Sequence, residues 1–356
     1  MNKGIGFIIL CFFIIFISLS YGEGQTVYQE VYYDAVRKDN YFDSITEALS
    51  HVAENGTLYI CKPIRITSQL KSLKIDKAMT IKGESNQEKS IIIEGGGTGP
   101  VFNLGNTVSS FRLENIYAVG VGAAVVKGHG ECITIINCNF EDCMPIDITS
   151  AKVKEIVLDG NRVIRAYTSI RPASYGAKVA VKNNYFGVTG GEARGLNIEN
   201  CEVFIENNRF NGVSLNVYDG EKALGLIQYN TFERDGRKIM VTENDQKLHF
   251  QNNKIYKDAG QVYYRGNGTI DFTKNWWGSK EGPKEGVMDG NIDYSNWALF
   301  EDFRRYQKDS YTLTDLQDAY DHLKKDANAD NWIYDMDKNN HINFLDIIAI
   351  TRSISE

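Results

Sequence analysis

Cysteine is scarce in this sequence and net positive charge is absent, and each lack excludes a class of protein. Of its six cysteines, an odd number follows residue 22, irregularly spaced: Cys61, Cys132, Cys138, Cys143 and Cys201. A disulfide framework needs an even, regular set, so we expect buried free thiols, with a Cys138–Cys143 pair as the alternative. The net charge of −7 leaves no basic face for binding nucleic acid.

Long apolar stretches are also lacking, apart from one at the N-terminus. Ile5–Leu19 is an almost unbroken apolar run behind Lys3, and Ser20 and Gly22 are small residues suited to a cleavage site. This order is typical of a secretory signal peptide, residues 1–22. A retained membrane anchor is the alternative, although a spanning helix needs about 20 apolar residues. We therefore expect a secreted protein, extracellular or at the cell surface, with no membrane contact after cleavage.

What the sequence has in abundance is a repeat. One pattern recurs: apolar, any, apolar, two variable residues, Asn, any, then a large apolar residue. Its Asn position, here called the Asn slot, is filled by Asn161, Asn184, Asn208, Asn230, Asn253 and Asn275, with Cys138 in the slot one repeat earlier. Successive slots are 23, 23, 24, 22, 23 and 22 residues apart. Such self-similarity at a fixed period indicates a solenoid.

The pattern inside each repeat is that of a β-strand. Apolar residues that alternate over four to five positions predict a strand with one buried face. A single coil cannot bury this face alone, so neighbouring coils stack and share a core. Asn at a turn tolerates a left-handed backbone, and its amide can bond from coil to coil. The sequence therefore predicts an all-β parallel β-helix of about ten coils with an interior Asn ladder.

Upstream the pattern weakens but does not stop. Asn115 fills the slot of one more coil, slightly out of register, and Met79–Gly83 and Ile91–Ile93 are strands of earlier coils. Residues 43–54 have one apolar helical face, and we expect this helix to cap the open end of the solenoid. The β-helix domain then spans residues 23–302.

Both ends of this region resemble known β-helix proteins. The first end, similar to the opening of pectin-lyase-like right-handed β-helix proteins, consists of Ser44–Ala48, Asn55–Ile60 and Met79–Gly83. The second, similar to the terminal coil of bacterial and archaeal surface β-helix proteins, consists of Asn275–Gly278, Gly282–Pro283 and Ile292–Trp297. The resemblance covers about residues 40–300. It implies a right-handed helix and says almost nothing about chemistry.

After a polar linker, 303–311, residues 312–356 predict a small helical module. A first helix is expected over Leu313–Lys325. The stretch that follows has oxygen-bearing side chains at positions 1, 3, 5 and 12 of a calcium loop, namely Asp335, Asp337, Asn339 and Asp346. His341 stands at position 7, which supplies only its backbone carbonyl. The alternative is a solvated acidic turn.

This stretch resembles one half of a dockerin, the module by which extracellular enzymes and surface proteins attach to cohesin domains. The four ligand positions above match those of the family, and Asn343 falls on its polar ninth position. Dockerins normally carry two such loops, whereas one is clear here. The resemblance implies bound Ca²⁺ and a cohesin-type partner.

The register of the repeat also places charged side chains on the outer surface. Two residues before the slot come Asp159, Lys182 and Glu206 on successive coils, and one residue after it come Arg162, Tyr185 and Arg209. One interpretation is an ion-pair ladder, which is worth little to stability. The alternative is an acidic-sugar site that binds substrate through Asp159, Tyr185 and Glu206. In that site Arg162, Lys182 and Arg209 hold carboxylates, and one of them acts as the base.

No nucleophile–base pair, phosphate-binding loop or zinc spacing stands out, so the architecture is clearer than the chemistry. The sequence favours an extracellular β-helix protein that binds a polysaccharide, a cell-surface glycan or a surface partner. The calcium module would attach or stabilise it. A polysaccharide lyase or glycoside hydrolase acting on acidic polysaccharide of the pectin or alginate type is the first alternative. A structural surface spacer is the second.

Overall fold

The structure is a computed structural model of the 356-residue chain. The residues it describes are 26–33, 40–67, 72–94, 99–120, 124–188, 195–218, 224–233, 238–242, 247–303, 311, 313–327, 331, 334–336, 339 and 341–355. The expected signal peptide, residues 1–22, lies outside them, as does most of the expected linker.

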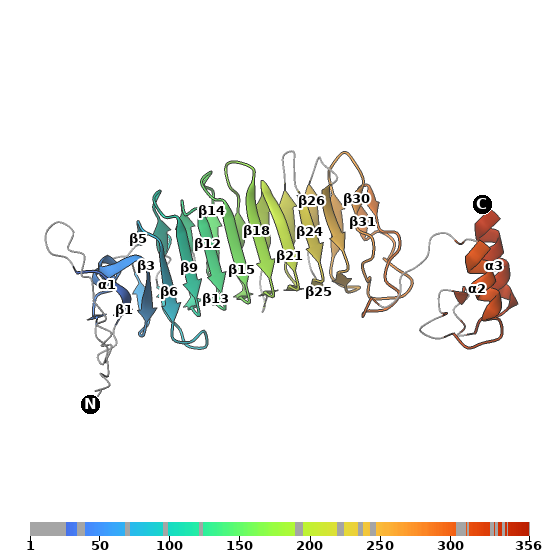
Figure 1. The fold of residues 1–356 in the computed structure, drawn as a ribbon, viewed down its shortest axis with the longest axis horizontal. Coiled ribbons are helices and arrows are strands. Elements are labelled where there is room, and N and C mark those ends of the chain that lie inside the picture. The colour runs from blue at the N-terminus through green and yellow to red at the C-terminus, as the bar shows by residue number, and fades with distance from the viewer. Residues whose placement is uncertain are drawn as a thin grey trace, which may run out of the picture.

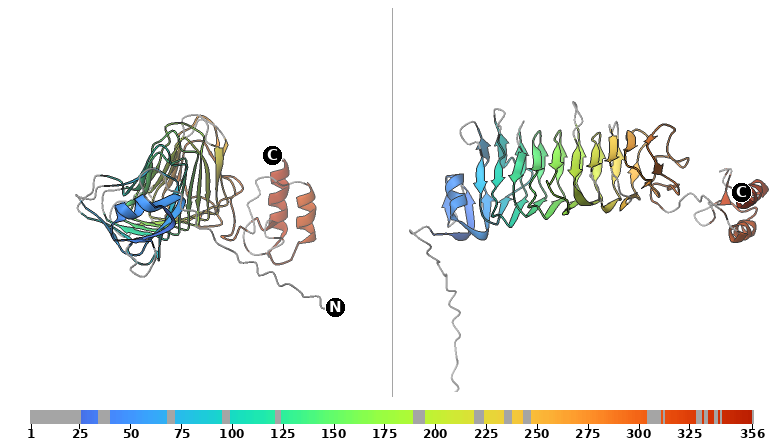
Figure 2. Two further views of the ribbon diagram at one scale, coloured as in Figure 1. Left: turned by 60° about the vertical axis from the view of Figure 1, so that its left-hand side comes forward. Right: turned by 90° about the horizontal axis from the view of Figure 1, so that it is seen from above.

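The chain winds into a right-handed parallel β-helix, as the repeat predicts. The coils from β3 to β29 contribute one strand each to three parallel sheets, here named A, B and C in the order in which the chain visits them. Figure 1 shows the coils stacked along the long axis, and Figure 2 shows the same stack from above. No helix among the described residues is long and apolar enough to cross a membrane.

Sheet A is the longest and includes the strands that carry the repeat pattern. Its strands are β1 (Tyr28–Tyr33), β2 (Tyr41–Phe42), β3 (Val52–Ile60), β6 (Met79–Gly83), β9 (Ser110–Glu114), β12 (Cys132–Ile136), β15 (Glu155–Asp159), β18 (Ala177–Lys182), β21 (Cys201–Glu206), β24 (Leu224–Gln228), β27 (Lys247–Gln251), β30 (Ile270–Asp271) and β32 (Ile292–Asp293).

Sheets B and C consist of shorter strands. Sheet B contains β4 (Ile64–Ile66), β7 (Ile91–Ile93), β10 (Tyr117–Val119), β13 (Asn139–Glu141), β16 (Arg162–Ile164), β19 (Tyr185–Gly187), β22 (Arg209–Asn211), β25 (Thr231–Glu233) and β28 (Lys254–Ile255). Sheet C contains β5 (Leu73–Ile75), β8 (Phe102–Leu104), β11 (Ala124–Gly128), β14 (Met144–Ile148), β17 (Thr168–Ile170), β20 (Leu196–Glu199), β23 (Leu215–Tyr218), β26 (Lys238–Thr242), β29 (Gln261–Tyr264) and β31 (Met288–Asp289).

The core lies inside the coils, where similar apolar side chains stack on one another from coil to coil. The apolar residues of each strand alternate inward, as in β21, where Val203 and Ile205 are fully buried. The large residue after the slot points inward too, so that Phe186, Phe210 and Phe232 stack with ring centroids 5.2 and 4.9 Å apart. Repetition thus buries one continuous apolar core.

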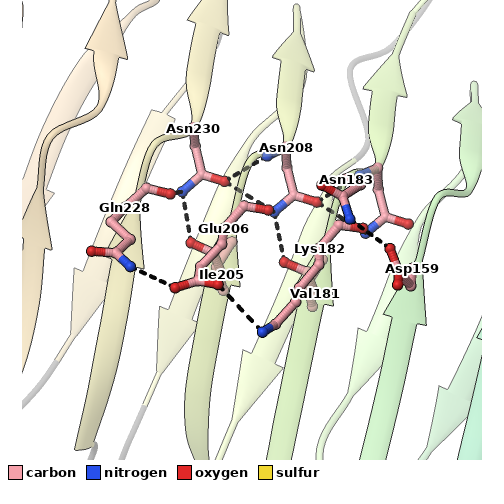
Figure 3. Close-up of polar contacts among 10 residues, drawn as sticks. Asp159, Val181, Lys182, Asn183, Ile205, Glu206, Asn208, Gln228 and Asn230 are labelled. Carbon is pink, nitrogen blue, oxygen red and sulfur yellow. Dashed lines mark hydrogen bonds and ion pairs between the residues drawn. The ribbon is translucent and has the colours of Figure 1, made fainter.

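The slot residues form the expected interior ladder at the turn from sheet A to sheet B (Figure 3). Asn208 Nδ2 donates to Val181 O of the previous coil at 2.7 Å and to Asn230 Oδ1 of the next at 2.9 Å. The backbone N–H of Asn208 donates to the same Oδ1, also at 2.9 Å. The buried backbone groups of this turn therefore find partners in the slot amides, which satisfies a requirement of every buried turn.

Cys138 is the odd rung of the ladder, as expected. Its backbone N–H donates to Asn161 Oδ1 at 2.9 Å, and its own Sγ accepts the backbone N–H of Ile116 at 3.4 Å. Burial raises the pKa of the Cys138 thiol to about 12, and that of Cys143 equally. Neither forms a disulfide, so the Cys138–Cys143 pair is not formed.

Two details of the ladder differ from the sequence-based expectation. Ile116, not Asn115, occupies the slot of the coil before Cys138. This coil is in register with the next, because Leu113 pairs with Ile135 and Ile116 follows Leu113 by three residues, as Cys138 follows Ile135. The left-handed backbone does not belong to the slot residue either. It belongs to the residue before it, for example Asn183 with φ 56° and Asn207 with φ 56°. The slot Asn is therefore required for its amide rather than for its backbone freedom.

The N-terminal helix is present but shorter than the expected 43–54. Helix α1 spans Ile45–His51, and the Ser44 side chain caps it by accepting the N–H of Glu47. Val52 has an extended backbone and pairs with Tyr28 of β1, so strand pairing ends the helix. Strands β1 and β2 extend sheet A past β3 at this end.

The C-terminal residues form the expected helix pair. Helix α2 spans Leu313–Asp321 and helix α3 spans Phe344–Ser355. The first helix is shorter than Leu313–Lys325 because Lys324 and Lys325 bond instead to the backbone of Ile342. A small separate core joins the pair, built from Ala319, Tyr334, Ile342 and Ile350.

Candidate functional site on the outer faces of the sheets

The residues two positions before the slot line up on the outer face of sheet A. Asp159, Lys182 and Glu206 are register neighbours on β15, β18 and β21 (Figure 3). Lys182 Nζ lies 3.3 Å from Glu206 Oε2, and Glu206 Oε1 accepts Gln228 Nε2 at 2.5 Å. Asp159 Oδ1 accepts Asn183 Nδ2 at 2.8 Å. Lys182 and Glu206 of this column therefore form an ion pair, whereas Asp159 bonds to a neutral amide.

The residues one position after the slot lie on sheet B instead. Arg162, Tyr185 and Arg209 are register neighbours on β16, β19 and β22. The two guanidinium Cζ atoms lie 5.8 and 5.7 Å from the centroid of the Tyr185 ring, one on each side. Arg209 also pairs with Glu233, at 2.8 Å through Nε and 2.7 Å through the terminal nitrogen. The two columns thus belong to different sheets, and Lys182 is not part of the Arg–Tyr–Arg group.

The calcium-loop residues are partly described. Asp346 is fully buried, and its two carboxylate oxygens accept the backbone N–H groups of Met336 and Asn343 at 2.6 and 2.8 Å. Asp335 is buried as well, and its Oδ1 accepts the N–H of Asn339 at 3.1 Å. The last expected ligand is therefore held beside the first, which closes the loop on itself.

The loop is anchored through its eighth position. Ile342 is fully buried, donates its N–H to Lys325 O at 2.9 Å and accepts the N–H of Lys324 at 2.7 Å. Next to it, His341 Nδ1 lies 2.6 Å from Asp326 Oδ1. This short antiparallel pairing fixes the path of the backbone at the position whose carbonyl is expected to face the ion.

The donor set of this loop fits a hard cation. Two buried carboxylates beside one another repel, and a bound cation relieves that cost. Carboxylate, amide and backbone oxygens are the ligands that Ca²⁺ prefers. Asp337 lies outside the described residues, and among the described ones no group of three or more His, Cys, Asp or Glu side chains converges on a metal position.

Sheet C carries an outer row of polar side chains that the sequence did not predict. Register pairs connect them from coil to coil: Lys74, Asn103, Lys127, Asp147, Ser169, Asn197 and Asn216. Ser169 and Asn197 are almost fully buried despite this outward position. Ser169 Oγ accepts Arg171 Nε and Asn197 Nδ2 donates to Glu199 Oε1, both at 2.9 Å. Here polar groups are packed together rather than solvated.

Asp147 is the centre of this cluster. Its Oδ2 accepts Lys127 Nζ at 2.8 Å. Its Oδ1 is buried and has no hydrogen-bond partner among the described residues, and the nearest cation, Arg171, lies 3.9 Å away. An unmade bond to a buried charged oxygen costs free energy, and such groups in folded proteins require an explanation, a catalytic role among them.

Two tyrosines border the cluster. Burial raises the pKa of Tyr167, while Arg171 and a hydrogen bond with Ser169 oppose this shift. Burial likewise raises the pKa of Tyr218, beside Tyr167 and Glu199. Both phenols therefore stay protonated at neutral pH and can donate hydrogen bonds. Aromatic rings next to acids, bases and amides are the usual lining of a sugar-binding surface.

A hollow continues the same face toward the N-terminus. It measures about 380 Å³ and is lined in part by Lys74, Asp76, Asn103 and His129, with Gly105 among them. A Cβ on Gly105 would lie 2.4 Å from Asp76 Oδ1, so the carboxylate leans across the glycine. His129 Nδ1 lies 3.0 Å from Ser150 Oγ, which orients the imidazole at the far wall. The outer face of sheet C is thus both polar and concave.

The comparison with protein families agrees with this fold. Residues 122–277 match the family model for a right handed beta helix region. No curated protein and no solved structure matches the chain. The match covers the strands that carry the Asn ladder and most of the sheet C cluster. It supports a right-handed β-helix, an architecture consistent with a carbohydrate-related or surface protein.

Proposed function

We propose that this protein binds a polysaccharide along the outer face of sheet C. The observation that carries the proposal is the Asp147 cluster, in which a buried carboxylate oxygen lacks a hydrogen bond beside Lys127, Arg171 and Tyr167. Sugar hydroxyls donate and accept hydrogen bonds at once, so they suit a surface of mixed acids, bases and amides. The stacked coils place these polar groups in one row along the sheet, parallel to which an extended chain of sugars can lie.

A glycan array tests this proposal with a matched pair of variants. Asp147→Asn removes the central charge, and Asp289→Asn removes a carboxylate from the same face that is also ion-paired, to Arg265 at 2.6 Å. We expect at least tenfold weaker binding for the first variant, because a charge-assisted bond is worth about 1.5–3 kcal/mol. The second should bind like the parent. Equal binding by the parent and Asp147→Asn would contradict the proposal.

The same cluster favours cleavage of an acidic polysaccharide as the second candidate function. Asp147, Tyr167 and Lys127 place a carboxylate, a phenol and an ammonium group within one small area. Cleavage by elimination or hydrolysis needs such paired acid and base groups. The assay is the release of unsaturated or reducing ends from polygalacturonate and alginate. If neither polysaccharide yields product while binding is retained, the outer face of sheet C binds polysaccharide without cleaving it.

We further propose that the C-terminal module binds Ca²⁺ and attaches the protein to a surface partner of cohesin type. The loop around the buried Asp335 and Asp346 supports the first part. The second is supported by apolar side chains that α3 leaves exposed: Phe344 at 58%, Leu345 at 64% and Ile348 at 46%. The same proposal includes secretion, because the polysaccharide and the cohesin-type partner are both expected outside the cell.

Calcium titration tests the module directly. We expect added Ca²⁺ to slow amide hydrogen exchange in α2 and α3 and to leave the β-helix unchanged, because the two cores are separate. Mg²⁺ at the same concentration is the control, since it demands stricter octahedral geometry. Exchange rates that do not respond to Ca²⁺ would refute the calcium site, whatever the outcome for the polysaccharide face.

A further inference from the structure

The outer face of sheet A carries an apolar stripe. It consists of four register neighbours on β15, β18, β21 and β24, each partly exposed: Val157, Ala180, Phe204 and Leu226. The residues between them along each strand, such as Val203 and Ile205, point inward and build the core. The stripe ends at polar residues, Thr134 of β12 and His249 of β27. Exposed apolar patches with a polar rim mark interaction sites.

Charged rows flank this stripe on both sides, and their charges alternate in sign from coil to coil. The row at the start of β15, β18 and β21 is Glu155, Lys178 and Glu202. The row at their end, seen in Figure 3, is Asp159, Lys182 and Glu206. Lys182 already pairs with Glu206 of its own chain at 3.3 Å. Lys178 is exposed and forms no ion pair with any described residue, so its charge is available to a partner.

A second copy of the chain can meet this face in two symmetric ways. Both use a twofold axis that lies between the two faces. An axis along the solenoid places Lys178 against Lys182 of the second copy and Glu202 against Glu206, so that like charges meet. An axis along the strands, between β18 and β21, places Lys178 against Glu202 and Lys182 against Glu206 instead. Only this second arrangement, with the two solenoids antiparallel, brings opposite charges together.

The apolar positions match in the same arrangement. Ala180 faces Phe204 of the second copy, and Val157 faces Leu226, so a smaller side chain meets a larger one in each case. Facing sheets pack about 10 Å apart with their side chains interdigitated. The stripe is therefore complementary to itself in shape as well as in charge.

The matched area is large enough for a specific pair. The strands from β9 to β30 cover about 38 Å at the usual strand spacing, and the outward residues of one strand cover about 16 Å. Each copy thus offers roughly 600 Å², and a pair buries about 1,200 Å², the lower end of the range for specific complexes. At the ends of this area Arg112 of β9 faces Asp271 of β30, again with opposite charges.

From this geometry we propose that two copies of this protein dimerise through the outer faces of sheet A, with their solenoids antiparallel. The interface uses no residue of sheet C, so the face proposed for polysaccharide stays open in both copies. The dimer therefore does not depend on that proposal.

Sedimentation equilibrium of the full chain tests the dimer. We expect a reversible monomer–dimer equilibrium in the parent, and dimerisation at least about tenfold weaker in Phe204→Thr, because symmetry removes this apolar contact twice. Tyr229→Asn, which removes a tyrosine 51% exposed outside the stripe, is the matched control and should dimerise as the parent does. A parent that stays monomeric at every concentration, or a dimer unaffected by Phe204→Thr, overturns the proposal.

Charge exchange tests which residues meet. Lys178→Glu and Glu202→Lys each leave two contacts of like charge across the axis, so either variant alone should dimerise at least about tenfold more weakly than the parent. An equimolar mixture of the two variants should form a heterodimer as strong as the parent dimer, because both contacts again join opposite charges. Recovery in the mixture also shows that both variants are folded.

The control for charge exchange lies on another sheet. Arg162→Glu reverses an exposed cation of sheet B and should leave dimerisation as in the parent. A mixture of Lys178→Glu and Glu202→Lys that dimerises no better than either variant alone would overturn the antiparallel dimer. Single variants that dimerise as strongly as the parent would overturn it too, since they would place the contact between copies elsewhere on the chain.

Discussion

Two polar systems run along this β-helix, one inside it and one on its surface, and they differ in how completely their hydrogen bonds are made. The interior ladder repeats Asn in six successive coils, Asn161 to Asn275, and leaves no amide of its central rungs unpaired. The sheet C row mixes Lys, Asn, Asp and Ser from coil to coil, and its central carboxylate Asp147 keeps a buried oxygen without a hydrogen bond among the described residues.

The difference separates structure from function. A residue repeated at every coil with all bonds made solves a problem that every coil shares, namely the buried backbone of one turn. A cluster that occurs once, at a cost to stability, answers no structural need of the repeat. The Asn ladder therefore accounts for the fold, and the irregular outer rows are where binding is expected.

The largest expected effect is the loss of a rung. Asn208→Ala removes the acceptor of the backbone N–H of Asn184 and the side-chain donor to the carbonyl of Val181, both in a buried turn. We expect the free energy of unfolding to fall by about 3 kcal/mol, measured as a shift in the urea midpoint. A change below about 1 kcal/mol in the free energy of unfolding would show that the ladder does not stabilise the fold appreciably.

Repairing the odd rung should act in the opposite direction. In Cys138→Asn the new amide can accept the N–H of Ile116 better than sulfur does, and can donate to Asn161 Oδ1. We expect a gain of about 1 kcal/mol in the free energy of unfolding. Destabilisation by this variant would indicate that the slot is too narrow upstream of Asn161 for an amide.

The outer ladder of sheet A should matter much less than the inner one. Lys182→Gln breaks the ion pair with Glu206, whose partners are partly exposed. We expect the free energy of unfolding to change by about 0.5 kcal/mol or less, by the same urea titration as for Asn208→Ala. A loss as large as that of Asn208→Ala would erase the distinction between inner and outer polar systems.

A pH titration tests the contribution of one group of surface ion pairs to stability. Arg165 bonds to Asp142 and Glu141 at 2.7 Å and lowers the pKa of Asp142; with Tyr117 it also lowers that of Glu141. A depressed carboxyl pKa stabilises the fold above the unfolded pKa and ceases to do so as pH falls. The stability advantage of the parent over Asp142→Asn should therefore shrink below about pH 4. An advantage that does not change with pH would contradict the assigned cause.

The ladder, the core and the strands of sheet A could be predicted because a turn of two residues fixes the register between sheets A and B. Sheet C could not be predicted in this way. Ser169 follows Asn161 by eight residues, whereas Asn197 follows Asn184 by thirteen, so loops of varying length hide their alignment. Only pairing in space shows that Asp147, Ser169 and Asn197 stand in one row.

The group formed by Arg162, Tyr185 and Arg209 was half predictable. The spacing placed Arg162, Tyr185 and Arg209 side by side, because all three follow the slot directly. The sequence could not show that the edge of the Tyr185 ring lies close to Gly187, since that depends on a rotamer. Nor could it show that Glu233 neutralises only one of the two arginines.

The most direct test of this account measures melting temperature and polysaccharide affinity together for Asn208→Ala and Asp147→Asn. We predict that each variant changes one of the two properties and leaves the other as in the parent. Asn208→Ala should melt earlier and bind as the parent does below its transition, whereas Asp147→Asn should melt as the parent does and lose affinity. If both properties fall together in both variants, the separation between a structural interior ladder and a functional outer face is wrong.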